Sequence, residues 1–342
     1  MRTKRFFAAL CVSSLLALVC GSQHVARSKG ATTPENIAPD QTVNAGQELQ
    51  EETAEGPVSS QKFTFDRVES NVEYCGRANG QQMDIYYPLK SSKKPALAVL
   101  YIHGGRWQHG DKTQGGTEQI HELISRGFLV AAVNYRLFYT DAQGPHNKFP
   151  AMIEDVKCAV RYLRAHATEL HIDPQRFGAW GWSAGGYLVS LLGTSDDSDF
   201  LSGEHQRESA RIQAVVDMYG PADLAAPDYC VTPLCHEIFN RDEADRRRAS
   251  PITYVTSNDP PFLIIQGDKD TLVPLGQSRE FFQKLQANGV PAKLVIVKNA
   301  EHMLKFNPPG SQIDPSQAWT KGLVRTTDKL FGELRSASSG EE

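Results

Sequence analysis

The chain has 342 residues, 40% of them hydrophobic, and a formal net charge of −4 at neutral pH. Once the two ends are set aside, the remaining length suits one large α/β domain. It contains no internal repeat. Because no basic stripe is available to hold phosphate groups, we expect no nucleic-acid partner.

Residues 1–21 are predicted to be an export signal, so that the protein is periplasmic or secreted. A basic start at residues 2–5 precedes an apolar run over 6–20, and small residues suited to cleavage follow. The run is shorter than a typical transmembrane helix. An uncleaved anchor is one alternative. A membrane tether through a lipid on Cys20 is another, ranked second because Val19 is bulkier than the residue usual before such a cysteine.

Residues 22–60 are rich in Gln, Thr, Glu, Ala and Pro and nearly devoid of aromatic residues. Such a segment buries too little apolar surface to order itself, so a disordered linker is predicted. The catalytic domain is then expected over 61–335, followed by a flexible tail over 336–342.

The domain alternates apolar runs with helical patterns, which predicts a mostly parallel sheet with helices on both faces. The predicted strands are residues 63–68, 82–87, 97–102, 128–133, 177–182, 213–218, 262–266 and 293–297. The clearest helix begins after Pro150, where apolar residues from Ile153 to Ala167 recur at spacings of three and four. Glu154 and Asp155 in its first turn are interpreted as structural, because they suit the positive end of the helix dipole.

Residues 103–107, His-Gly-Gly-Arg-Trp, follow the strand predicted over 97–102. Glycines let a loop approach a substrate oxygen closely, and backbone N–H groups there can bind the oxyanion of an acyl-transfer intermediate. Gly105 and Arg106 are therefore candidate oxyanion donors, together with Ala184 after the nucleophile. His103 is interpreted as a structural residue of the loop, and a plain Gly-Gly turn is the alternative.

Residues 181–185 read Gly-Trp-Ser-Ala-Gly, between an apolar run and a Gly/Ala-rich stretch. A Gly-x-Ser-x-Gly sequence at a strand-to-helix turn holds its serine exposed at the end of a sheet. Ser183 is therefore the candidate nucleophile. Trp182 is expected either to line the pocket or to pack in the core.

An acid and a base follow in the order that this type of site requires. Asp270 comes after the strand predicted over 262–266, and His302 after that over 293–297. The carboxyl ends of parallel strands meet at one edge of the sheet, where sites form. Asp270 is preferred over Asp268, since the first aspartate of such a turn commonly binds local backbone N–H groups.

Four cysteines remain beyond the signal. Cys230 and Cys235 are close enough in one loop to form a disulfide, whereas Cys75 and Cys158 are expected to be free and buried. A metal site at Cys230, Cys235 and His236 is the alternative, but a fourth ligand is missing nearby. No metal or cofactor is predicted.

In these motifs the chain resembles the α/β-hydrolases, and more closely the bacterial esterase/lipase branch that includes feruloyl and acetyl esterases. The matching segments are residues 103–107, 134–136 (Asn-Tyr-Arg), 181–186, 267–274 and 301–302. The resemblance implies that Ser183 is the nucleophile, Asp270 the acid and His302 the base. Many relatives have a small residue where this chain has Arg106, and glycine where it has Glu301.

The predicted function is hydrolysis of short-chain or small aromatic carboxylic esters, with acetyl or feruloyl groups on carbohydrates as candidates. A peptidase-like or lipase-type hydrolase and a catalytically inactive binding module are the alternatives. Between about residue 219 and residue 262 no helix has the broad apolar face of a lipase lid. We therefore expect an open site with little apolar wall, and kcat/KM that falls beyond about four acyl carbons.

Overall fold

The computed structural model describes residues 65–76, 80–90 and 92–304. Within them, eight strands form one sheet in the order β1-β2-β4-β3-β7-β8-β9-β10. The strands are β1 Val68–Glu73, β2 Gln82–Tyr86, β3 Ala96–Ile102, β4 Leu129–Val133, β7 Ile172–Trp182, β8 Ala214–Met218, β9 Phe262–Gly267 and β10 Ala292–Val297. A separate hairpin joins β5 Tyr139–Asp141 to β6 Gly144–His146.

The sheet is parallel from β4 through β10 and antiparallel only where β2 pairs with β1 and β4. The central strands are continuous apolar runs because both of their faces are covered. Their predicted positions are confirmed. The first predicted strand, 63–68, is wrong: the structure has β1 at Val68–Glu73, a mostly exposed edge strand without an apolar alternation to mark it.

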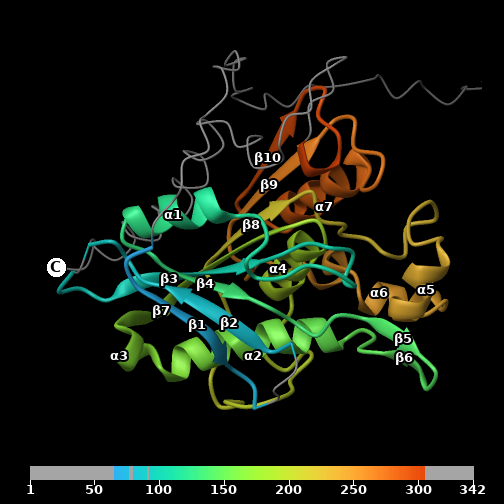
Figure 1. Cartoon of the computed structure of the whole chain (residues 1–342). Helices are drawn as coiled ribbons and strands as arrows, with labels where there is room; N and C mark the ends of the chain where they lie inside the picture. Colours follow the sequence, from blue (N-terminus) through green and yellow to red (C-terminus); the bar gives the residue numbers. More distant parts are fainter. Residues whose placement is uncertain (1–64, 77–79, 91, 305–342) are drawn as a thin grey trace, which may run out of the picture. The chain divides into compact units, whose positions relative to one another are not determined.

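Helices cover both faces of the sheet, as predicted (Figure 1). They are α1 Thr117–Ser125, α2 Ala151–Ala165, α3 Ala167–Leu170, α4 Ala184–Thr194, α5 Pro233–Phe239, α6 Glu243–Arg248 and α7 Leu275–Ala287, with short 3₁₀ turns η1 Pro251–Tyr254 and η2 His302–Leu304. Apolar side chains of α2, α4 and α7 join the core on one face, and those of α1 join the core on the other.

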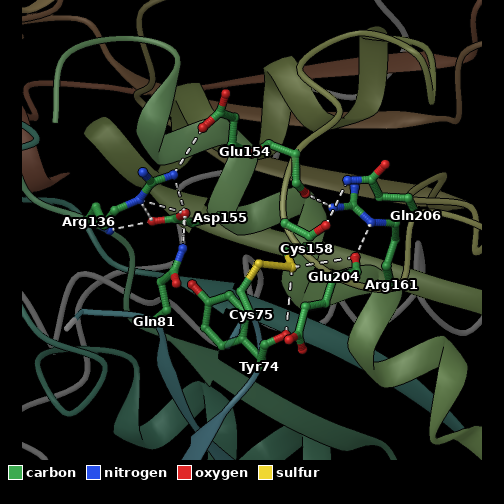
Figure 2. The surroundings of a disulfide bond; sticks show 12 residues. Tyr74, Cys75, Gln81, Arg136, Glu154, Asp155, Cys158, Arg161, Glu204 and Gln206 are labelled. Carbon is green, nitrogen blue, oxygen red and sulfur yellow. Dashed lines mark hydrogen bonds and ion pairs between the residues drawn. A yellow bond between two sulfur atoms is a disulfide. The ribbon is translucent and has the colours of Figure 1, made fainter. Parts of the chain in front are cut away.

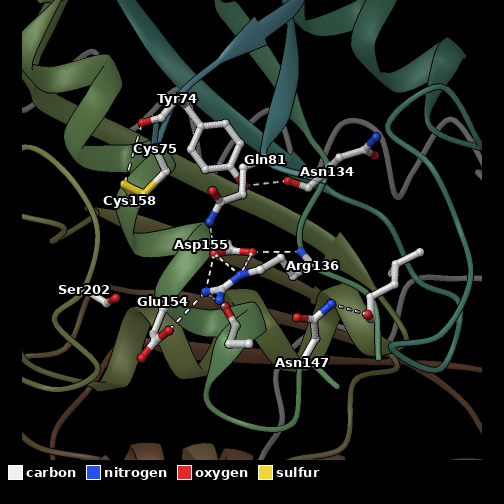
Figure 3. A network of polar contacts seen from close by, with 12 residues as sticks. Tyr74, Cys75, Gln81, Asn134, Arg136, Asn147, Glu154, Asp155, Cys158 and Ser202 are labelled. Carbon is white, nitrogen blue, oxygen red and sulfur yellow. Dashed lines mark hydrogen bonds and ion pairs between the residues drawn. A yellow bond between two sulfur atoms is a disulfide. The ribbon is translucent and has the colours of Figure 1, made fainter. Parts of the chain in front are cut away.

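Helix α2 begins directly after Pro150, and its predicted apolar face is fully buried. The helix ends at Ala165, so that Ala167 belongs to α3 instead. Glu154 and Asp155 are structural, as interpreted, but their partners are side chains from other segments of the chain. Arg136 forms ion pairs with Asp155 at 2.7 Å and Glu154 at 3.0 Å, and Gln81 donates to Asp155 at 2.5 Å (Figure 3).

A disulfide joins Cys75, just after β1, to Cys158 on α2, with 6.1 Å between their Cα atoms (Figure 2). The expectation of two free thiols is therefore wrong. The cysteines are 83 residues apart in sequence, and only the packing of α2 against the edge of the sheet brings them together. Gly203 passes so close that a Cβ there would lie 2.2 Å from the sulfur of Cys75. The predicted signal, linker and tail lie outside the described residues.

Candidate active site

Ser183 lies at the turn between β7 and α4, at the C-terminal edge of the sheet. Its backbone has φ 55° and ψ −119°, a conformation that is costly for a residue with a side chain. A Cβ on Gly181 would lie 2.5 Å from the carbonyl oxygen of Gly185, and one on Gly185 would lie 2.0 Å from that of Ile102. Both glycines are thus required, because backbone occupies the space that any side chain would need.

The structure brings the three predicted side chains into one hydrogen-bonded chain. Ser183 Oγ lies 3.0 Å from His302 Nε2, and His302 Nδ1 lies 2.7 Å from Asp270 Oδ2. Asp270 and Ser183 are buried, at 6% and 7% exposure, whereas the imidazole is partly accessible. The ring of Tyr219 meets His302 edge-on, at 5.0 Å between centroids. This arrangement allows a proton to pass between the serine and the imidazole while a carboxylate orients the ring.

The two aspartates of the turn after β9 have different partners. Asp270 accepts hydrogen bonds from the backbone N–H groups of Leu272 and Val273, both at 2.9 Å, in addition to its contact with His302. Asp268 instead accepts from the backbone N–H of Asn299 at 2.6 Å and so ties its turn to the loop after β10. The geometry agrees with the preference for Asp270, because this carboxylate contacts His302. The reason given for the preference is wrong, since Asp270 and not Asp268 binds the local backbone N–H groups.

Gln266 is a partner of the acid that the sequence did not reveal. It is fully buried on β9, donates to Asp270 Oδ2 at 2.9 Å and to the carbonyl of Val273 at 3.0 Å, and accepts from Ser278 at 2.9 Å. It holds the carboxylate in the position that faces His302. A polar residue at the end of an apolar strand, directly before the acid turn, was the available signal.

The loop after β3 is fixed in an unusual backbone conformation. Gly105 has φ 112°, and a Cβ there would lie 2.0 Å from the carbonyl oxygen of His109. Arg106 and Trp107 follow with φ 55° and 62°. Arg106 and Ala184 line the same cavity as Ser183, while Gly105 lies half-buried at the start of the turn.

The first two residues of the Asn-Tyr-Arg motif, Asn134 and Tyr135, form hydrogen bonds with this loop and the residues after it. His103 is buried and stacks on the ring of Tyr135 at 4.5 Å, and the Tyr135 hydroxyl donates to the backbone carbonyl of His103 at 3.1 Å. Asn134 accepts from the backbone N–H of Lys112 at 2.6 Å. His103 thus supports the loop. Among the described residues it shares no hydrogen bond or ring contact with Ser183, Asp270 or His302. Trp182 packs on Gly104 and donates to the Tyr101 hydroxyl at 2.8 Å, and it is not among the residues that line the cavity.

A cavity of about 250 Å³ opens beside Ser183. It is lined by Arg106, Trp107, Ser183, Ala184, Pro221, Asp228, Tyr229, Cys230, Val231, Thr232, Leu234, Cys235, Thr271, Leu272 and Val273. Most of these side chains are apolar, so the expectation of little apolar wall is wrong. Most of the wall comes from the loop before α5 and the first turn of that helix, and residues 271–273 after β9 add to it. None of these segments has the sequence pattern of a lid helix.

The predicted bridge between Cys230 and Cys235 is confirmed, with 5.2 Å between the Cα atoms. It closes the loop that forms the cavity wall, and Thr232 within the loop caps α5 by accepting from the backbone N–H of Cys235 at 3.3 Å. Because both sulfurs are bonded to each other, the alternative of a metal site with His236 does not hold. The described residues contain no group of three or more His, Cys, Asp or Glu side chains suited to a metal.

Asp217 on β8 is a buried carboxyl beneath the nucleophile turn. It accepts from Ser190 Oγ at 2.8 Å and from the backbone N–H of Gly220 at 2.9 Å. Complete burial raises the pKa of Asp217 to about 7, although these two hydrogen bonds oppose the rise. A Cβ on Gly186 would lie 2.4 Å from this carboxyl, so the side chain fills the space directly under α4.

Comparisons with known proteins find a matching family model and similarity to proteins named as esterases. The BD-FAE family model matches residues 83–285. Esterase LipC and the probable carboxylic ester hydrolase LipM, both of Mycobacterium tuberculosis, are 30% and 32% identical to the chain over 60% and 66% of its length. The matches cover 52% of each relative, so the chain spans about half the length of these curated relatives.

A solved structure, a truncated form of a carbohydrate esterase from gut microbiota, is 27% identical, with a TM-score of 0.69. The likeness covers 82% of this chain and 100% of that one. The architecture is therefore the α/β-hydrolase fold, as the sequence predicted. Across the residues that the structure describes, no helix combines the length and apolarity needed to span a bilayer.

Proposed function

The chain belongs to the BD-FAE family, and from that premise we propose that it is a serine esterase acting on carboxylic esters. The observation that carries the proposal is the hydrogen-bonded chain from Ser183 through His302 to Asp270, which opens on a cavity. The relatives named as esterases support the same reaction class.

In the proposed reaction, His302 takes the proton of Ser183 as its oxygen attacks the ester carbonyl. Asp270 fixes the orientation of the imidazole and stabilises its charged form. The backbone N–H groups of Ala184, Gly105 and Arg106 face the developing oxyanion. His302 then gives the proton to the leaving alcohol, and water repeats the sequence on the acyl-enzyme.

The proposed substrates are short-chain or small aromatic esters, including acetyl or feruloyl groups on carbohydrates. The cavity of about 250 Å³ exceeds the roughly 150 Å³ in which benzene fits, so a short acyl group or a single aromatic ring has room. The likeness to a carbohydrate esterase supports a saccharide on the alcohol side.

We propose further that the enzyme is exported. The two disulfides support this, because such bonds persist in oxidising compartments and are rare in the cytosol. Mass determination of the protein recovered from each cell fraction would locate it and show whether the first 21 residues have been removed or Cys20 lipidated.

Steady-state kinetics with 4-nitrophenyl acetate, butyrate and octanoate test the proposal. We expect kcat/KM to fall beyond butyrate, and Ser183→Ala to lower kcat by about 10⁴-fold or more. Ser125→Ala, which changes a half-buried serine on α1, is the matched control and should keep wild-type rates. A folded wild-type protein that turns over none of these esters would favour the inactive binding module, and a maximum at octanoate would favour a lipase.

A further inference from the structure

Arg106 is the positively charged residue of the cavity lining, and the proposed reaction makes no use of its charge. Its backbone N–H belongs to the oxyanion loop, and the residue is exposed and lines the cavity that contains Ser183. Among the described residues it has no ion pair and no side-chain hydrogen bond. Its backbone has φ 55°, a conformation that costs free energy in any residue other than glycine.

Tyr229 supplies a second donor in the same cavity. It is half-buried in the wall, and within the described part of the chain its hydroxyl makes no hydrogen bond. Burial raises the pKa of Tyr229, Asp270 adds to the rise and Arg106 opposes it. The tyrosine therefore lies within electrostatic reach of both the triad and the guanidinium.

Arg106 and Tyr229 together present hydrogen-bond donors, and a carboxylate matches an arginine in both charge and geometry. Asp228 is the cavity's exposed carboxylate, and no ion pair between it and Arg106 occurs among the described residues. Arg106 is thus available to a substrate group, and Asp228 places a repulsive charge on the rim that any anionic substrate must avoid.

We propose that Arg106 and Tyr229 form a subsite for a carboxylate of the substrate, so that the preferred esters are acidic ones. In a carbohydrate substrate this group is the carboxylate of a uronic acid close to the esterified position. The inference rests on the proposed esterase function and deepens it: the triad cleaves the ester, and Arg106 selects which esters reach it.

Two matched substrate pairs test the subsite from either side of the scissile bond. The leaving-group pair is 4-acetoxybenzoate against neutral 4-acetoxybenzamide. The acyl pair is the 4-nitrophenyl hemiester of glutaric acid against 4-nitrophenyl pentanoate. The quantity measured is the ratio of kcat/KM for the acidic ester to that for the neutral one, so that any loss common to both substrates cancels.

We expect Arg106→Gln to lower this ratio about fivefold in at least one pair, the size expected for a partly exposed ion pair. Arg106→Lys keeps the charge and should retain most of the ratio. Tyr229→Phe should lower it by a smaller factor, and Asp228→Asn should raise it. High salt should weaken the preference of the wild-type enzyme.

The proposal is overturned when Arg106→Gln changes the ratio in neither pair, or when Arg106→Lys lowers it as much as Arg106→Gln. Absence of turnover of every ester by the wild-type enzyme would instead count against the esterase function. The subsite is then judged by calorimetric binding of 4-acetoxybenzoate to Ser183→Ala, with and without Arg106→Gln. An affinity about fivefold weaker in the double variant supports the subsite, and equal affinities contradict it.

Discussion

The catalytic floor and the cavity wall of this protein are built in different ways. The floor consists of Ser183, His302 and Asp270, which lie at strand ends and are held by backbone contacts and buried polar partners. Most of the wall is the loop 228–235, which is closed by one local disulfide and carries exposed side chains. Val231, for example, is 62% exposed.

This difference separates two tasks. The floor tolerates little change, because a methyl group on Gly181 or Gly185 would collide with backbone. Val231 in the wall and Arg106 in the oxyanion loop are exposed residues of the cavity lining, so their replacement disturbs no buried packing. We therefore expect changes in the floor to act on kcat, and changes in the wall to act on KM and on the choice of substrate.

The largest expected effect is in the floor. Asp270→Asn should lower kcat by about 10⁴-fold, equivalent to about 5 kcal/mol, because the imidazole loses the carboxylate that orients it and stabilises its charge. Asp268→Asn is the matched control in the same turn and should cost about tenfold or less, since the carboxylate of Asp268 accepts its hydrogen bond from the backbone N–H of Asn299 and not from His302. Steady-state kcat with 4-nitrophenyl acetate distinguishes the two, and a larger loss at Asp268 would reverse their assignment.

The next effect concerns the disulfide that lies away from the cavity. Replacing Cys75 and Cys158 by Ala opens a link across 83 residues, and loop entropy predicts a loss of about 4 to 5 kcal/mol in the free energy of unfolding. Urea denaturation measures this loss. Because neither residue lines the cavity, kcat and KM measured well below the unfolding temperature should not change. A changed KM would contradict the expectation that substrate binding depends on the wall and not on this distant disulfide.

A smaller effect is the pH dependence of stability due to Asp217. Its pKa is raised to about 7 in the folded protein, so folding favours the protonated form. The stabilisation is complete below the ordinary pKa of about 3.9 and is lost as the pH rises through about 7. Between pH 5 and pH 8 we expect the free energy of unfolding of the wild type to fall by about 3 kcal/mol relative to Asp217→Asn. Urea denaturation at both pH values checks this. Parallel curves for the two proteins would show that the carboxyl does not titrate there.

The smallest expected effect on stability comes from removing the disulfide of the cavity wall, Cys230–Cys235. Replacing Cys230 and Cys235 by Ala should lower the free energy of unfolding by about 2 kcal/mol, as expected for a loop of 5 residues. It should also raise KM severalfold at nearly unchanged kcat, because the loop must then be ordered by each substrate that binds. The Cys75/Cys158 variant is the matched control. Equal KM values in the wild type and in both variants would contradict a role of the bridge in shaping the cavity.

The sequence predicted those parts of the molecule that depend on local patterns. Ser183, Asp270 and His302 each follow an apolar run that is a strand of the sheet, and because these strands are parallel their C-terminal ends meet at one edge. The bridge between Cys230 and Cys235 was predicted for the same reason, since its two residues share one loop.

What the sequence did not predict depends on contacts between distant segments. Cys75 meets Cys158 only because α2 packs against the edge of the sheet, although an even number of cysteines beyond the signal was a usable sign. Gln266 and Asp217 act through partners on other elements. The apolar cavity wall was missed because its side chains come from several short segments, none of which has a helical apolar face of its own.

The central claim, that the chain is a serine hydrolase acting through Ser183, is tested most directly by covalent labelling with a fluorophosphonate. Intact mass and peptide mapping of the wild-type protein should show one adduct, on Ser183, and none on the Ser183→Ala variant. Asp270→Asn should label far more slowly than Asp268→Asn. An adduct on another residue, or equal labelling of the wild type and Ser183→Ala, would contradict the account.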